Sequence, residues 1–274
     1  MSGAPFEKLV SVIIPVFNGA GFLLPSLQSA REAIAHAAGR RPDVPPEAFE
    51  IILCDDASTD GSLQQIKEAV RDDPQVRVVA HPVNRGAGAA RNTAIQASSG
   101  EILFFLDVGD AFFPPHVDRC LDVLSDKPEF GLVKTGIATA ADVDLTWLAQ
   151  VTERVVFNTA IRRECHDAVG GFPEDPELRV LRLESSFYCE MVQGVFLWER
   201  IPEATVLHKV RPGSVCDVRR ESLRARGDTS SPLTPAQLEV LPILMDRQRD
   251  RLMALGIDDV RGGTRVDSIV VKDD

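Results

Sequence analysis

The sequence lacks the cysteine patterns that bind zinc or build a disulfide framework. Its five cysteines are far apart, odd in number and never form a Cys-x-x-Cys pair. Isolated thiols of this kind fit a reducing compartment. We therefore expect a cytoplasmic protein without structural zinc.

Long apolar runs and an excess of positive charge are also missing. No stretch approaches the roughly 20 apolar residues that span a bilayer, and the first residues lack the basic and apolar segments of a signal peptide. The chain has 30 Lys and Arg against 41 Asp and Glu, a net charge of −11. Because phosphate contacts need Lys and Arg, this balance argues against nucleic acid as a partner and against adsorption to anionic membranes.

The first half of the chain alternates β-branched apolar runs with helical patterns. The predicted strands are 9–17, 49–54, 76–80 and 101–106. The predicted helices are 23–38, 62–70, 89–97 and about 115–124. Continuous apolar strands that alternate with helices predict a parallel sheet covered on both faces.

Polar segments follow each of the four predicted strands: Asn18, 55–60, 84–86 and 107–110. Ligands of such sheets bind beyond the carboxyl ends of the strands. The sequence therefore predicts that these segments converge on one ligand-binding edge.

The second half is less regular. Predicted strands are 131–138, 155–161, 195–201 and 204–209, and predicted helices are 187–194 and 234–255. The last helix has Leu238, Leu241, Leu244, Met245, Leu252 and Leu255 as its expected apolar face. His208, Lys209 and Arg211 form a small basic cluster that could face a diphosphate or solvent.

Asp55 and Asp56 come directly after the second strand. A carboxylate there can accept the imide N–H of a uracil ring. Asp is also an ordinary turn former and helix cap, so a structural role stays open. Arg91 has two interpretations as well, because it could contact a nucleotide or lie on a solvated helix face.

Asp107 and Asp110 follow the most hydrophobic strand. Carboxylates at the mouth of a buried strand suit a divalent cation that bridges two phosphates, although Asp110 could instead cap the next helix. Glu184 and Glu190 flank a predicted helix start. Either could act as a general base or lie on the helix surface.

Three segments of the first half together resemble the family 2 glycosyltransferases of the GT-A fold. They are SVIIPVFNGAGFL (11–23), FEIILCDDASTDGS (49–62) and HPVNRGAGAARNTAIQASSGEILFFLD (81–107). The second half matches more loosely, through 161–174 and 211–214. The resemblance covers about residues 9–215.

The resemblance implies an α/β fold with a Rossmann-like, mostly parallel sheet, helices on both faces and a C-terminal helical extension. It implies a glycosyltransferase domain over residues 1–216. This domain would comprise a nucleotide-binding half at 9–125 and an acceptor half at 126–216. A helical extension and tail would occupy 217–274.

The resemblance also implies the transfer of a sugar, with inversion, from a nucleoside diphosphate sugar to a hydroxyl acceptor. Uracil, guanine and thymine remain possible bases, with a UDP-sugar as the favoured donor. The implied nucleotide-binding residues are Pro15, Phe17, Asn18, Asp55, Asp56, Arg91 and Asp107. A Mg²⁺ or Mn²⁺ ion on Asp107 and Asp110 would offset charge on the leaving diphosphate. Glu184 would be the catalytic base.

The chain departs from the family's pattern in three places. Gly109 stands where the Asp-x-Asp metal motif has its second carboxylate, and Ser185 follows Glu184 where the family has Asp. Lys209-Val210-Arg211 replaces an Arg-x-His segment. These departures leave a second hypothesis open, a catalytically degenerate domain that binds a nucleotide or a protein partner. A dinucleotide oxidoreductase is a distant third, because the first strand is followed only by Gly-x-Gly.

Overall fold

The computed structural model of the chain describes residues 10–139, 145–209 and 235–257. The strands are β1 (Val10–Val16), β2 (Phe49–Asp55), β3 (Val76–Ala80), β4 (Ile102–Phe105), β5 (Ala111–Phe112), β6 (Leu132–Thr139), β7 (Thr159–Arg162) and β8 (Trp198–His208). The helices are α1 (Leu23–Arg40), α2 (Ser62–Ala69), α3 (Ala87–Gln96), α4 (His116–Asp126), α5 (Leu145–Arg154), α6 (Arg163–Ala168), α7 (Pro176–Leu181), α8 (Glu184–Val195) and α10 (Pro235–Ala254). A short 3₁₀ helix, η1 (Pro46–Ala48), precedes β2.

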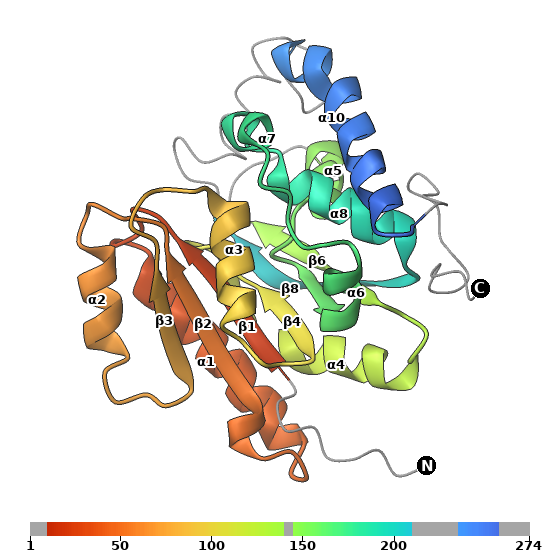
Figure 1. Cartoon of the computed structure of the whole chain (residues 1–274). Coiled ribbons are helices and arrows are strands. Elements are labelled where there is room, and N and C mark those ends of the chain that lie inside the picture. The colour runs from red at the N-terminus through yellow and green to blue at the C-terminus, as the bar shows by residue number, and fades with distance from the viewer. Residues whose placement is uncertain (1–9, 140–144, 210–234, 258–274) are drawn as a thin grey trace.

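The eight strands of the described residues form one sheet in the order β3-β2-β1-β4-β7-β6-β8-β5. Figure 1 shows β3, β2, β1 and β4 side by side. The four strands β3, β2, β1 and β4 are parallel neighbours. β7 runs antiparallel to both β4 and β6, and β5 runs antiparallel to β8. The predicted mostly parallel α/β architecture is therefore confirmed.

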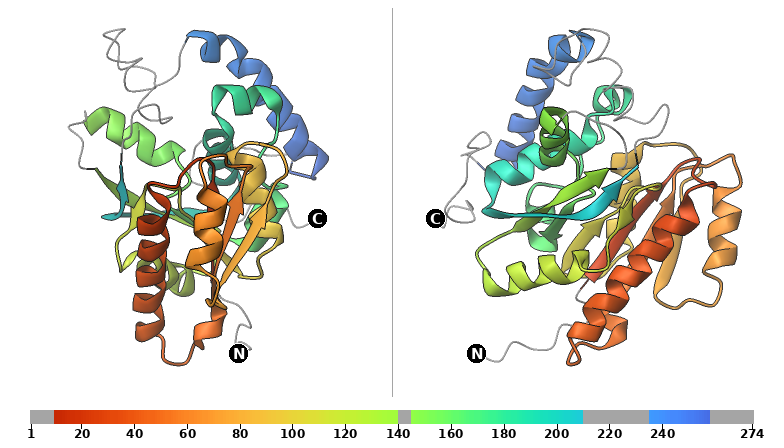
Figure 2. Two further views of the ribbon diagram at one scale, coloured as in Figure 1. Left: turned by 90° about the vertical axis from the view of Figure 1, so that its left-hand side faces the viewer. Right: turned by 180° about the vertical axis from the view of Figure 1, so that it is seen from behind.

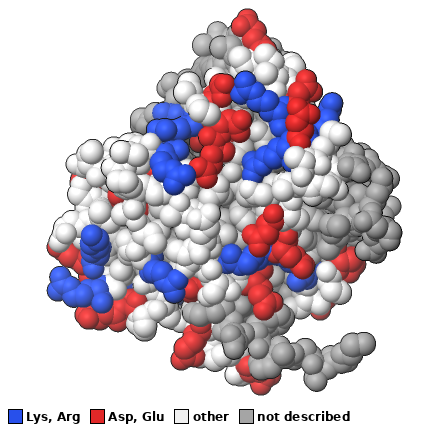
Figure 3. Space-filling view, viewed as in Figure 1, with Lys and Arg blue, Asp and Glu red and all other residues white. Residues whose placement is uncertain are grey.

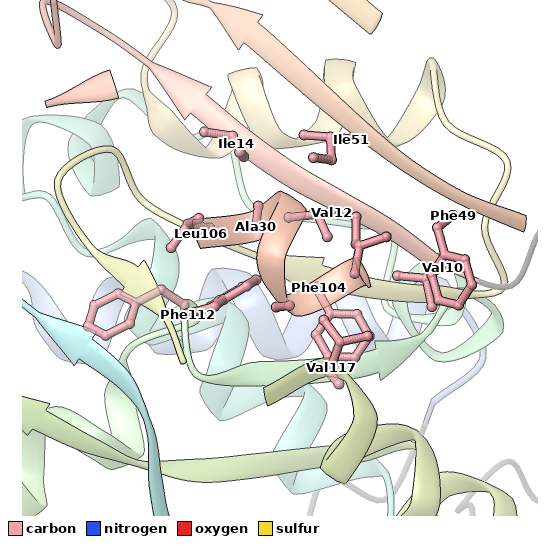
Figure 4. Packing of buried hydrophobic residues seen from close by; sticks show 14 of the residues in the cluster. Val10, Val12, Ile14, Ala30, Phe49, Ile51, Phe104, Leu106, Phe112 and Val117 are labelled. Carbon is pink, nitrogen blue, oxygen red and sulfur yellow. The ribbon is translucent and has the colours of Figure 1, made fainter. Parts of the chain in front are cut away.

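Alternate residues of each central strand point to opposite faces of the sheet. Val12 and Ile14 of β1 belong to the core that packs against α1 and α4, together with Phe104 of β4 (Figure 4). Ile13 of β1 belongs to a second core on the opposite face, beneath α3 and α8. Figure 2 shows these two helical layers with the sheet between them. Because both faces are covered, the strand sequences are continuously apolar rather than alternating.

The predicted C-terminal helix is present as α10. On its expected apolar face, Leu244 and Leu252 are buried, whereas Met245 is 42% and Leu255 47% exposed. The side chain of Leu238 is not among those that the structure describes. The predicted domain boundary at 216/217 also lies outside the described residues. The helix therefore packs through a narrower apolar stripe than we predicted.

The strand predicted at 155–161 is shorter than expected. β7 begins only at Thr159, and the preceding residues lead out of α5. The buried side-chain amide of Asn158 donates to the carbonyl oxygens of Thr135 and Thr152, at 2.7 and 3.1 Å. This side chain binds the backbone of both β6 and α5, and the apolar run of Val155 to Phe157 turns there before the chain joins the sheet.

The strands predicted at 195–201 and 204–209 are a single strand, β8. Its pairing with β6 shifts register around Gly136, since Thr135 pairs with Ile201 and Gly136 with Ala204. Pro202 lies in this irregular stretch. Because proline has no N–H to donate, the irregularity allows the strand to continue past it.

None of the helices in the described part of the chain combines the length and the apolar character that crossing a bilayer requires.

Gly100 should tolerate no larger side chain. A Cβ there would lie 2.5 Å from the backbone nitrogen of Ser11. We expect Gly100→Ala to lower the free energy of unfolding by about 1–3 kcal/mol through overpacking, measured by urea denaturation. Gly39→Ala is the matched control, because its Cβ would meet nothing within 4 Å on α1, and it should stabilise by up to about 1 kcal/mol. Equal effects of the two substitutions would contradict this packing account.

Candidate active site

A cavity of about 540 Å³ opens at the carboxyl ends of the parallel strands, where α3, α7 and α8 meet. The predicted site residues that line it are Pro15, Phe17, Asp56, Arg91, Asp107, Asp110 and Glu184. Asn18 and Asp55 lie outside its lining. The structure thus brings seven of the nine predicted side chains to one cavity, as the convergence of the polar segments predicts.

One end of the cavity lies beside β1 and β2. Phe17 follows β1 and is 53% exposed, which leaves an aromatic face at the rim. Asp56 is buried, and its carboxylate accepts the backbone N–H groups of Arg85 and Gly86, both at 2.8 Å. Its Oδ1 also lies 2.7 Å from His81 Nδ1. Asp56 therefore anchors the loop that enters α3, in addition to lining the cavity.

Asp55 and Asn18 do not line the cavity, but they form hydrogen bonds within the turns at this end of it. Asp55 Oδ2 accepts the backbone N–H of Ser58 at 3.1 Å. Asn18 Oδ1 accepts the N–H of Thr59 at 2.8 Å, and the Asn18 N–H donates to Ser58 Oγ at 3.0 Å. These bonds connect the turns after β1 and β2. The geometry gives Asp55 the turn-forming role that the sequence left open.

Arg91 of α3 occupies the centre of the site and is only 2% exposed. Its Nη2 donates to Asp107 Oδ1 at 2.5 Å, and its Nη1 donates to Ser185 Oγ at 3.0 Å. The guanidinium also lies over the ring of Phe172, 5.3 Å from its centroid. The interpretation of Arg91 as a residue on a solvated helix face is therefore wrong. This arginine joins the end of β4 to the start of α8.

Asp107 and Asp110 lie on the same cavity in different environments. The Asp107 side chain is 35% exposed. Asp110 is buried, accepts the Lys209 N–H at 3.1 Å, and has Oδ1 2.9 Å from His208 Nδ1. Burial raises the pKa of Asp110 above its ordinary value, and the negative charge of Asp107 raises it further, against the opposing effect of His208.

The described residues contain no group of three or more His, Cys, Asp or Glu side chains placed to hold a metal ion. Mg²⁺, however, is commonly bound by only one or two carboxylates, with water and substrate phosphates as its other ligands. Asp107 and Asp110 line one cavity and provide these oxygen donors. The donor set therefore fits a cation that binds together with a diphosphate.

Glu184 is the first residue of α8 and is 9% exposed. Burial raises the pKa of its carboxyl group, while the positive charges of Arg91, Arg179 and Arg182 oppose the rise. Glu190 is exposed farther along the same helix and does not line the cavity. Of the two candidate bases, only Glu184 faces the site.

Two glycines at the start of α3 permit the close approach of α7 and α8. Gly86 has φ +97°, and a Cβ there would lie 3.0 Å from the Arg179 side chain. At Gly88 a Cβ would lie 3.1 Å from the carbonyl oxygen of Pro173 and 3.3 Å from Glu184 Cβ. The small residues of this segment thus serve close packing.

Three further cavity residues could not be identified from the sequence: Arg154, Arg179 and Arg182. All three are exposed arginines outside any recognisable motif. In the predicted basic cluster, Lys209 lines the cavity and Arg211 lies outside the described residues. Figure 3 shows that basic and acidic side chains lie next to one another over the upper part of the molecule, around α7.

Comparison with known families and proteins gives consistent matches. The family model described as Glycosyl transferase family 2 matches residues 11–173. Chondroitin synthase from Escherichia coli is 32% identical over 115 residues, which are 42% of this chain and 15% of that protein. An uncharacterised glycosyltransferase from Haemophilus influenzae is 31% identical over 116 residues, 42% of each chain. These matches span less than half the length of either relative.

Two solved structures share the fold at low sequence identity. S. aureus TarS 1–349 in complex with UDP-GlcNAc has a TM-score of 0.60 at 16% identity, covering 91% of this chain and 72% of that one. The mannosyltransferase PcManGT from Pyrobaculum calidifontis, in complex with GDP-Man and Mn²⁺, has a TM-score of 0.59 at 20% identity, covering 90% and 72%. At these identities the likeness shows a common fold.

Proposed function

Because the chain belongs to glycosyltransferase family 2, we propose that it transfers a sugar from a nucleoside diphosphate sugar to a hydroxyl group of an acceptor, with inversion at the sugar carbon. One observation carries the proposal. A single cavity is lined by an exposed aromatic side chain, Phe17, by the carboxylates of Asp107 and Asp110, and by the buried carboxylate of Glu184. These groups suit, respectively, a nucleotide base, a divalent cation that would bind together with the diphosphate, and a proton transfer.

The end of the cavity near Phe17 and Pro15 would hold the nucleoside. An exposed aromatic ring offers a stacking surface for a base, and Asp56 retains acceptor capacity because two carboxylate oxygens provide about four sites. The related folds were solved with UDP-GlcNAc and GDP-Man, which supports this donor class. UDP is the first nucleotide to test.

A Mg²⁺ or Mn²⁺ ion would bind at Asp107, with Asp110 as a second ligand directly or through water. When bound, such an ion offsets the charge that develops on the leaving diphosphate. The protein's own contribution is to position the carboxylates. Arg91 fixes one oxygen of Asp107, while His208 and the Lys209 N–H hold Asp110. The Mn²⁺ bound in the mannosyltransferase structure supports this assignment.

Glu184 would accept the proton of the acceptor hydroxyl as that oxygen attacks the sugar carbon. A general base works best when its pKa is close to the working pH, and burial raises the pKa of Glu184 in this direction. Attack from the side opposite the leaving diphosphate, assisted by one carboxylate, gives inversion. The position of Glu184 in the cavity favours this function over a degenerate binding module.

Nucleotide binding tests the donor half of the proposal. We expect UDP, GDP or dTDP to bind the wild-type protein more tightly with Mn²⁺ than without it in calorimetric titrations. Asp107→Ala should remove the Mn²⁺-dependent gain, because it deletes a cation ligand. Asp246→Ala, on the exposed surface of α10, should change neither titration. Binding of none of the three nucleotides, or a gain that survives Asp107→Ala, would contradict the assignment.

Catalysis by Glu184 predicts a specific loss in Glu184→Gln. We expect kcat to fall by about 10²–10⁴-fold while nucleotide affinity is retained. In the wild type, kcat/KM should fall as pH decreases through the raised pKa of Glu184, because the protonated carboxyl group cannot accept a proton. Glu190→Gln should leave the rate and pH profile unchanged. An unaltered rate in Glu184→Gln would exclude this residue as the base.

A further inference from the structure

The cavity has more positive than negative side chains, although the whole chain carries a net charge of −11. Its basic residues are Arg91, Arg154, Arg179, Arg182 and Lys209. Its acidic residues are Asp56, Asp107, Asp110 and Glu184. Five cations face four carboxylates, so the cavity has a formal excess of one positive charge in a chain that is acidic as a whole.

Three of the four carboxylates already have hydrogen-bond or ion-pair partners within the protein. Asp56 accepts two backbone N–H groups, Asp107 pairs with Arg91, and Asp110 interacts with His208 and a backbone N–H. Glu184 is close to arginines of α3 and α7. The acidic side chains therefore leave cationic groups at the cavity wall to interact with a ligand.

Arg154, like Arg179 and Lys209, forms no ion pair with an acidic side chain of the described residues. It is exposed at the end of α5 and lines the cavity. Its neighbour Glu153 pairs with Arg200 instead. A guanidinium in such a position can bind a carboxylate or phosphate with two parallel hydrogen bonds.

The order of the strands separates Arg154 from the nucleoside end of the cavity. Phe17 follows β1, which borders β4 on one side, and Asp107 follows β4. Arg154 precedes β7, which borders β4 on the other side and runs antiparallel to it. The segment that enters β7 therefore lies at the carboxyl end of β4, away from Phe17. There the cavity wall continues as Val155, Val156 and Phe157.

We propose that the acceptor is an anionic saccharide and that Arg154 binds its carboxylate or phosphate group. The inference rests on the proposed glycosyl transfer, since it assigns the acceptor class of the same site. The partly exposed side chain of Val155, next to Arg154, would contact the sugar ring. The arginine would hold the charge of the acceptor and so place a hydroxyl group near Glu184.

Saccharide binding to the UDP-loaded protein tests this inference. The probes are hyaluronan hexasaccharide, which carries carboxylates, a phosphorylated mannohexaose, and neutral chitohexaose. We expect at least one anionic oligomer to bind the wild type tenfold or more tightly than chitohexaose, with an affinity that falls as salt rises. Arg154→Gln should abolish this preference without changing the Kd of UDP, whereas Arg154→Lys should retain part of it.

Arg119→Gln is the matched control, because Arg119 pairs with Glu203 away from the cavity lining, and it should behave as the wild type. Equal binding of neutral and anionic oligomers, or no binding of either anionic oligomer, would overturn the inference. So would an Arg154→Gln variant that keeps the preference or that loses UDP affinity. Failure of the wild type to bind any nucleotide would instead count against the proposed function itself.

Discussion

The ion pair between Arg91 and Asp107 is the contact on which the site depends. A buried guanidinium is costly unless its charge is paired and its N–H groups are bonded. Arg91 pairs its charge with one carboxylate after β4, donates to the hydroxyl of Ser185 on α8, and lies over the ring of Phe172. Its Nε is buried without a hydrogen-bond partner among the described residues, so the two Nη contacts carry the compensation. Side chains from three separate parts of the chain are thereby held around a single buried group.

The next residue of α3 reinforces this arrangement. Asn92 accepts the backbone N–H of Phe172 at 2.9 Å and donates to the Phe172 carbonyl at 3.0 Å and to Glu174 at 2.8 Å. The loop before α7 is thus fixed against α3, and the glycines of α3 let α7 and α8 approach. α10 supports the same elements from outside, where Leu244 packs with Phe187. Side chains from both halves of the chain therefore line one cavity.

Most of the first half could be predicted from the sequence because its signals are local. β-branched runs define the strands, and parallel strands must end at one edge, which explains why Phe17, Asp56 and Asp107 meet. The contact between Arg91 and Ser185 could not be predicted, because the two residues are 94 positions apart in the sequence. The second half depends on single long-range contacts, such as that of the Asn158 side chain. Its helices α6 and α7 have six residues each, too few for a clear helical period.

A double-mutant cycle tests the central role of the Arg91–Asp107 pair most directly. The free energy of unfolding would be measured by urea denaturation for the wild type, Arg91→Ala, Asp107→Asn and the double variant. We expect Arg91→Ala to cost about 3 kcal/mol, at the low end for a broken buried pair because Asp107 keeps some water. The two substitutions should couple by about 1–3 kcal/mol. Additive effects within about 0.5 kcal/mol would show that the two residues act independently and would contradict the account.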